Sequence, residues 1–113
     1  TSISDEILHE EQNCNLSMEQ QVLSLTETAK KAGADGVICS PLEVKSLRQN
    51  VGDNFLYVTP GIRPAGNAKD DQSRVATPAQ AKEWGSTAIV VGRPITLATN
   101  PEAAYAAIKK EFN

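Results

Sequence analysis

Three short apolar runs alternate with amphipathic segments along most of the chain. The runs lie at about residues 36–40, 55–59 and 87–92, and each has the length of a strand. Between them, apolar residues recur at the spacing of helices. Because the runs are continuously apolar and separated by helices, they predict a parallel sheet buried on both faces. The pattern therefore indicates an α/β fold built of βα units, either as an open doubly wound sheet or as a closed barrel.

Each predicted helix begins at a polar residue that can cap it. Three starts carry a capping box, in which Ser or Thr is followed three residues later by Glu or Gln: Ser17 with Gln20, Ser40 with Glu43, and Thr77 with Gln80. A further helix is predicted from Asn100-Pro101. In the first helix, Met18, Val22 and Leu25 fall on one stripe, which we expect to face the core.

Composition narrows the possible functions. The chain has 113 residues, of which 40% are hydrophobic and 22% charged, as in an ordinary soluble domain, so we expect one segment spanning 1–113. Its net charge of −3 gives no general attraction to nucleic acid or to acidic membranes. The longest apolar runs are too short for a membrane span or a signal sequence, so we expect a cytoplasmic protein.

Cysteine and histidine give little sign of chemistry. Cys39 lies inside the first apolar run, where a small buried thiol is expected, and Cys14 is far from it in the sequence. His9 lies in an acidic segment and is expected at the surface. Since no Cys/His spacing typical of a metal site occurs, no metal site is predicted.

The residues that follow the strands carry the functional signal, because ligands bind at the carboxyl ends of parallel strands. Gly61 and Arg63 follow the second run, and Gly92 and Arg93 follow the third. Glycine lets a bound group approach the backbone, and arginine offers a planar fork of donors suited to phosphate. These residues therefore predict a site that binds an oxyanion such as phosphate. The alternative interpretation is that Gly92 only forms a turn and that Arg93 is an ordinary surface charge. The loop at about 60–76 exceeds an ordinary connection, which indicates a function.

Taken together, these stretches resemble the carboxy-terminal half of the bacterial orotidine 5′-monophosphate (OMP) decarboxylase family. Several motifs carry the resemblance in one order over nearly the whole chain: Ala34-Asp35-Gly36-Val37-Ile38-Cys39-Ser40, Val58-Thr59-Pro60-Gly61-Ile62-Arg63-Pro64, Asp71-Gln72, Arg74-Val75, Thr77-Pro78, Val90-Val91-Gly92-Arg93-Pro94-Ile95-Thr96 and Asn100-Pro101.

The resemblance implies a (β/α)8 TIM barrel, of which this chain would supply the end of strand five through helix eight. It implies that Thr1 and Arg63 contact the substrate and that Gln72 lies on a mobile loop that closes over the nucleotide phosphate. Gly92 and Arg93 would hold that phosphate from below. The implied activity is decarboxylation of OMP to uridine monophosphate (UMP) in pyrimidine biosynthesis, without a cofactor, by a homodimer.

The catalytic motif of that family, Asp-x-Lys-x-x-Asp, does not occur in this sequence. No catalytic residue is therefore predicted here, and the missing amino-terminal half of the barrel is the expected partner. Two other interpretations stay open. One is another phosphate-sugar barrel of the same superfamily, such as a metal-dependent keto-gulonate phosphate decarboxylase. The other is a self-contained flavodoxin-like module that binds a phosphorylated ligand without chemistry.

Overall fold

One parallel sheet organises the chain. The computed structural model describes residues 2–66 and 74–113. Its sheet has the order β1-β2-β3, with β1 at Gly36–Ile38, β2 at Leu56–Thr59 and β3 at Ala88–Ile89. Both strand pairs are parallel, so the predicted α/β fold with a parallel sheet is confirmed. The strands are shorter than predicted; β1 ends early because Ser40 already caps the helical turn that follows it.

The four predicted helices form where their caps indicated: α1 Met18–Lys31, α2 Val44–Val51, α3 Pro78–Trp84 and α5 Pro101–Phe112. The helix that follows Ser40 begins with a 3-10 turn, η2 Pro41–Glu43, before α2. The short helix α4 Arg93–Thr96, which has no side-chain cap, and the π-helical turn η1 Ile7–Glu11 were not predicted. All three predicted capping boxes are present, and the Asn100 side chain accepts a hydrogen bond from the Ala103 N–H at 3.1 Å. In the described part of the chain, no helix has the length and apolar character needed to cross a membrane.

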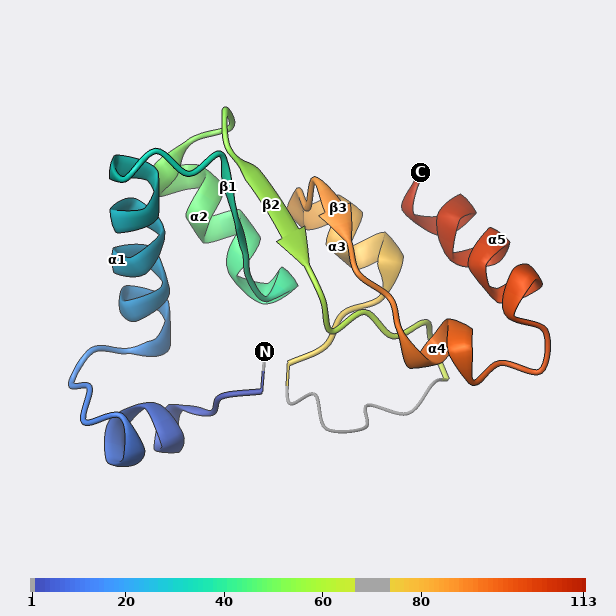
Figure 1. Ribbon diagram of the computed structural model, residues 1–113, viewed down its shortest axis with the longest axis horizontal. Coiled ribbons are helices and arrows are strands. Elements are labelled where there is room, and N and C mark those ends of the chain that lie inside the picture. Colours follow the sequence, from blue (N-terminus) through green and yellow to red (C-terminus); the bar gives the residue numbers. More distant parts are fainter. Residues whose placement is uncertain (1, 67–73) are drawn as a thin grey trace.

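The helices cover one face of the sheet. In Figure 1, α2 and α3 lie behind the strands, and among the described residues no helix lies in front of them. Side chains along the strands alternate accordingly: Tyr57 and Thr59 are completely buried, whereas Leu56 is 50% exposed and Ile38 is 70% exposed. The prediction of two buried faces is therefore wrong for this chain, because its described helices pack against one face only.

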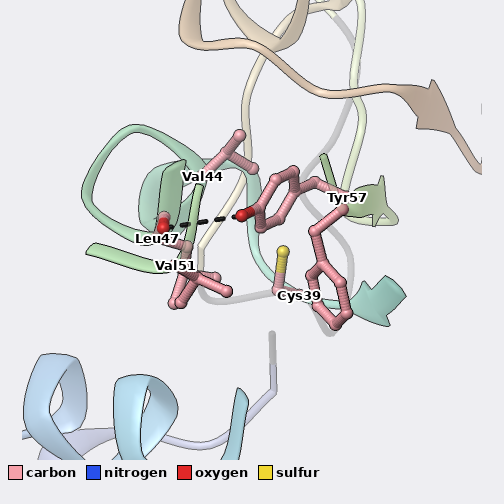
Figure 2. Close-up of a cluster of buried hydrophobic side chains, with 6 residues drawn as sticks. Cys39, Val44, Leu47, Val51 and Tyr57 are labelled. Atoms are coloured by element: carbon pink, nitrogen blue, oxygen red, sulfur yellow. Dashed lines mark hydrogen bonds between the residues drawn. The ribbon is translucent and has the colours of Figure 1, made fainter. Parts of the chain in front are cut away.

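The core lies between the sheet and α2. Figure 2 shows Cys39, Val44, Leu47, Val51 and Tyr57 packed together, and the Tyr57 hydroxyl donates to the Leu47 carbonyl at 3.5 Å. The same hydroxyl donates at 2.6 Å to the carbonyl of Gly52, directly after α2. The prediction that Cys39 is a buried thiol is confirmed.

The face that α1 turns inward differs from the predicted stripe. Leu25 is 59% exposed, whereas the neighbouring Thr26 is 3% exposed. The Thr26 hydroxyl donates to the Val22 carbonyl at 2.7 Å, so burial leaves it with a partner inside its own helix. Met18 and Val22 are half-buried as predicted, and Leu25 is not part of the inward face.

Strands β1 and β2 approach each other closely at Gly36, which is paired with Leu56. A Cβ atom built on Gly36 would lie 2.5 Å from both the Cβ and the carbonyl oxygen of Leu56. The absence of a side chain at this position therefore permits the observed separation of the two strands.

Candidate functional site

The predicted arginines follow the carboxyl ends of neighbouring strands. Strands β2 and β3 are adjacent and parallel, so the segments that leave them emerge at the same edge of the sheet (Figure 1). Arg63 lies shortly after β2, and Gly92 and Arg93 lie shortly after β3. The topology thus assigns all three residues to the segments that leave this one edge.

A tight turn and a single β-bridge position Arg63. Gly61 has φ 73°, in the left-handed region that favours glycine, and it turns the chain directly after Pro60. The Arg63 N–H then donates to the Ala76 carbonyl at 2.9 Å, and the Ala76 N–H donates to the Gly61 carbonyl at 3.1 Å. The Arg63 side chain is 8% exposed, and its Nη1 donates to the Ile62 carbonyl at 2.9 Å. The loop therefore returns to its own start and fixes the backbone of Arg63.

Open space lies beside Gly92. The residue is exposed, and a Cβ atom built on it would meet no other atom within 4 Å. The Gly92 carbonyl accepts hydrogen bonds from the N–H groups of Ile95 at 2.9 Å and Thr96 at 3.0 Å, which closes the turn of α4. Arg93 is the first residue of α4 and is half-buried. The backbone at Gly92 is consequently accessible to a ligand.

Two of the candidate residues, Thr1 and Gln72, lie outside the described residues. The long loop at about 60–76 is described only at its two ends, where Ile62 and Ala76 form their bridge. Of the five candidate residues, the described set contains Arg63, Gly92 and Arg93.

The structure adds an ion pair that sequence reasoning missed. The Glu43 Oε2 accepts from the Ser40 N–H at 2.9 Å, as predicted for its capping box, while the Glu43 Oε1 accepts from Arg74 Nη1. The partners are 31 residues apart, so no local pattern connects them. One feature of the sequence could have indicated the ion pair. The second capping box has the charged Glu43 at the position where the other two boxes have the neutral Gln20 and Gln80.

A cavity of about 510 Å³ lies between the amino-terminal segment, α1 and the start of α2. Glu43 and Arg74 form part of its wall. Close by, burial and, to a smaller extent, the negative charge of Glu43 raise the pKa of the Cys39 thiol to about 12. A thiol held in its neutral form is a poor nucleophile, so Cys39 has a structural role. Within residues 2–66 and 74–113, no cluster of three or more His, Cys, Asp or Glu could hold a metal ion.

Comparison with known proteins identifies the family. A family model described as orotidine 5′-phosphate decarboxylase / HUMPS matches residues 1–108. The chain is 95% identical over 113 residues to the orotidine 5′-phosphate decarboxylase of Lactobacillus gasseri and 78% identical to that of Lactobacillus acidophilus. Each match covers 100% of this chain and 48% of the relative. The chain therefore spans about half the length of the curated relatives it matches.

Solved structures agree with the sequence matches. The crystal structure of orotidine 5′-phosphate decarboxylase from Lactobacillus acidophilus superposes with a TM-score of 0.83 at 68% identity, over 100% of this chain and 46% of that one. The enzyme from Pyrococcus horikoshii superposes with a TM-score of 0.66 at 26% identity, over 84% of this chain and 43% of that one. The chain belongs to the orotidine 5′-phosphate decarboxylase / HUMPS family, in agreement with its strand-end motifs.

Proposed function

We propose that this chain is the substrate-phosphate-binding, carboxy-terminal half of an OMP decarboxylase that converts OMP to UMP. In this proposal it supplies the end of strand five through helix eight of a (β/α)8 barrel. Two observations support the half-barrel: the chain spans about half the length of its relatives, and one face of its sheet is uncovered by described helices. In the complete barrel, that face would be the packed interior.

The observation that carries the proposal is the position of Arg63 and Arg93 after adjacent parallel strands. We assign Gly92 and Arg93 to the substrate phosphate for two reasons. The space beside Gly92 is open, and one guanidinium group can donate two parallel hydrogen bonds to a phosphate group. Arg63 and Thr1 are assigned to substrate contacts. Gln72 is assigned to a loop at about 60–76 that closes over the phosphate.

The chemistry explains why phosphate binding matters to a decarboxylase. Loss of carbon dioxide from the orotate ring leaves an electron pair on a ring carbon without an attached π-acceptor, so the barrier is high. Binding energy from the remote phosphate can organise the closed site and exclude water, which lowers the free energy of the transition state relative to the free substrate. Each charge-assisted hydrogen bond to phosphate contributes roughly 1.5–3 kcal/mol.

Proton transfer and the stabilisation of charge at the ring are assigned to the part of the protein outside this chain. The sequence contains no Asp-x-Lys-x-x-Asp motif, which in this family carries the catalytic lysine and aspartates. We expect the complete enzyme to be a homodimer in which the partner contributes an aspartate. The 113 residues alone are therefore expected to bind part of the substrate and to lack decarboxylase activity.

The alternative functions receive less support. The family description also covers HUMPS enzymes, but the relatives compared above carry the name orotidine 5′-phosphate decarboxylase. A self-contained flavodoxin-like module would need helices on both faces of its sheet, whereas the described helices cover one. OMP decarboxylase remains the function that the observations support best.

A full-length protein tests the proposal directly. The amino-terminal part of the Lactobacillus gasseri relative is joined to this chain, and the product is called the completed protein below. We expect it to release carbon dioxide from OMP. Replacing Arg93 by Ala should lower kcat/KM for OMP by about tenfold to a hundredfold, from the loss of roughly 1.5–3 kcal/mol.

Two controls make this test specific. Orotidine lacks the phosphate, so its kcat/KM should be unchanged by Arg93→Ala. Lys109→Ala removes an exposed positive charge from α5 and should leave the reaction of OMP unchanged. An inactive completed protein, or an Arg93→Ala variant with normal kcat/KM for OMP, would contradict the assignment.

A further inference from the structure

The second capping box differs chemically from the other two. Gln20 Oε1 accepts from the Ser17 N–H at 3.0 Å, and Gln80 Oε1 accepts from the Thr77 N–H at 3.0 Å. Glu43 makes the equivalent bond to the Ser40 N–H at 2.9 Å. Since an amide performs this role twice in the same chain, the negative charge of Glu43 is not needed for capping.

The second oxygen of Glu43 has a different partner. Glu43 Oε1 accepts from Arg74 Nη1, and the two side chains are only 10% and 21% exposed. Limited exposure reduces screening by water and makes such a pair stronger than one at the open surface. A single carboxylate therefore joins the turn after β1 to the end of the loop that follows β2.

The connection continues to Arg63 through the backbone. Arg74 lies two residues before Ala76, whose N–H and carbonyl form both hydrogen bonds of the bridge to Gly61 and Arg63. Arg74 therefore lies on the returning side of the loop, next to the bridge, and its side chain is tied to Glu43. Every step of this path lies within the described residues.

We propose that Glu43 is a positioning residue, whose charge acts through Arg74 to hold the bridge at Ala76 and with it the backbone of Arg63. The inference rests on the proposed function, because Arg63 is assigned there to substrate binding. Glu43 does not need to touch the substrate. Its role is to keep one side of the candidate site in the geometry that receives the nucleotide.

The test uses Glu43→Gln in the completed protein, because glutamine retains the cap and loses the charge. We expect KM for OMP to rise about fivefold, the factor that corresponds to roughly 1 kcal/mol, with kcat changed much less. The unfolding temperature should stay close to that of the parent. Gln20→Glu is the matched control. It makes the reverse exchange, of an amide for a carboxylate, at the same position of the first capping box, and KM should not change.

Arg74→Gln provides a second variant that leaves the Ser40 cap untouched. It should raise KM to a similar extent, and the double variant should be no worse than either single one, because both remove the same interaction. Amide hydrogen exchange supplies a readout independent of activity: the N–H groups of Arg63 and Ala76 should exchange faster in both single variants.

The results separate this inference from the proposed function. Failure of the parent protein to decarboxylate OMP would overturn the proposed function, and the exchange rates at Arg63 and Ala76 would still test the positioning role. An active parent whose Glu43→Gln and Arg74→Gln variants keep normal KM and normal exchange would overturn the positioning role alone. A lower unfolding temperature with unchanged KM and unchanged exchange would also overturn it, since that result indicates a purely structural contact.

Discussion

Arg48 donates a hydrogen bond from Nη1 to the Gly85 carbonyl at 2.8 Å, which ties α2 to the end of α3. Its Nε donates to Asp53 Oδ1 at 3.0 Å, and its guanidinium carbon lies 5.6 Å from the centre of the Tyr57 ring. Asp53 and Gly85 precede β2 and β3, so this cluster lies at the amino-terminal ends of the strands, away from the candidate site. Its contribution should be to stability.

Replacing Arg48 by Met in the completed protein should lower the free energy of unfolding by roughly 1–2 kcal/mol, because the Gly85 carbonyl loses a charged donor. Urea unfolding measures this change. Lys45→Met on the same helix removes an exposed charge and should change stability little. A loss of OMP turnover without a loss of stability would contradict the structural role of Arg48.

Tyr57→Phe tests the hydrogen bond that joins the core to the end of α2. The Tyr57 side chain is completely buried, and its hydroxyl donates to Gly52 at 2.6 Å. Phenylalanine leaves that carbonyl without its donor, which should cost about 1–2 kcal/mol in urea unfolding. The same change at Tyr105, which is 55% exposed, should have almost no effect. Equal losses of stability at the two positions would show that the hydrogen bond from Tyr57 to Gly52 does not stabilise the fold.

Cys39 should make stability fall at high pH. Burial and the Glu43 carboxylate raise the pKa of this thiol from 9.0 to about 12. Between these values the unfolded chain loses the thiol proton while the folded chain retains it. The free energy of unfolding therefore decreases as pH rises, by up to about 1.4 kcal/mol per pH unit.

Urea unfolding of the parent and of Cys39→Ala at several pH values above 9 isolates this effect. The pKa of Tyr57 is also raised, chiefly by burial, and that part of its contribution is common to both proteins and cancels in the difference. The smaller rise that the Cys39 thiolate causes in the pKa of Tyr57 is lost with the thiol and belongs to the measured effect of Cys39. The parent should lose stability more steeply than the variant. Parallel pH profiles would show that the thiol ionises as easily in the folded state as in the unfolded one.

The 113-residue chain by itself should self-associate. Ile38, Leu56 and Val90 are 70%, 50% and 51% exposed and project from the strands or their ends. In the described sheet, β1 and β3 each pair with one neighbour only, which leaves edges available to other chains. Gel filtration should give species larger than a monomer that bind an apolar dye, and the completed protein should bind much less. A dye-free monomer would instead favour the self-contained module.

The sequence predicted the features that local chemistry determines. The helix starts at Ser17, Ser40, Thr77 and Asn100 were found because each cap lies within three residues of its partner. The order of apolar runs likewise predicted the parallel sheet. Features that depend on distant residues were missed. Apolar runs alone could not show that one sheet face lacks described helices, and the pair between Glu43 and Arg74 joins positions 31 residues apart.

For the candidate site, the sequence predicted position and not role. Arg63, Gly92 and Arg93 were singled out because they lie shortly after apolar runs, where ligands of parallel sheets bind, and the structure places them after β2 and β3 at one edge of the sheet. The half-exposed Leu25 and the buried Thr26 show the limit of periodicity, since a hydroxyl bonded within its own helix can replace an apolar side chain at the inward face. The substrate-binding roles of all five candidate residues stay predictions, and Thr1 and Gln72 also lie outside the described residues.

The close approach at Gly36 restricts how this chain can change. A Cβ atom there would lie 2.5 Å from the Cβ and from the carbonyl oxygen of Leu56, and 2.9 Å from its Cα. The oxygen and the Cα belong to the main chain of any residue, and every residue except glycine has the Cβ, so no shortening of the side chain at position 56 can compensate. A library randomised at both positions of the completed protein and selected for growth without supplied uracil should return glycine at 36, while position 56 varies.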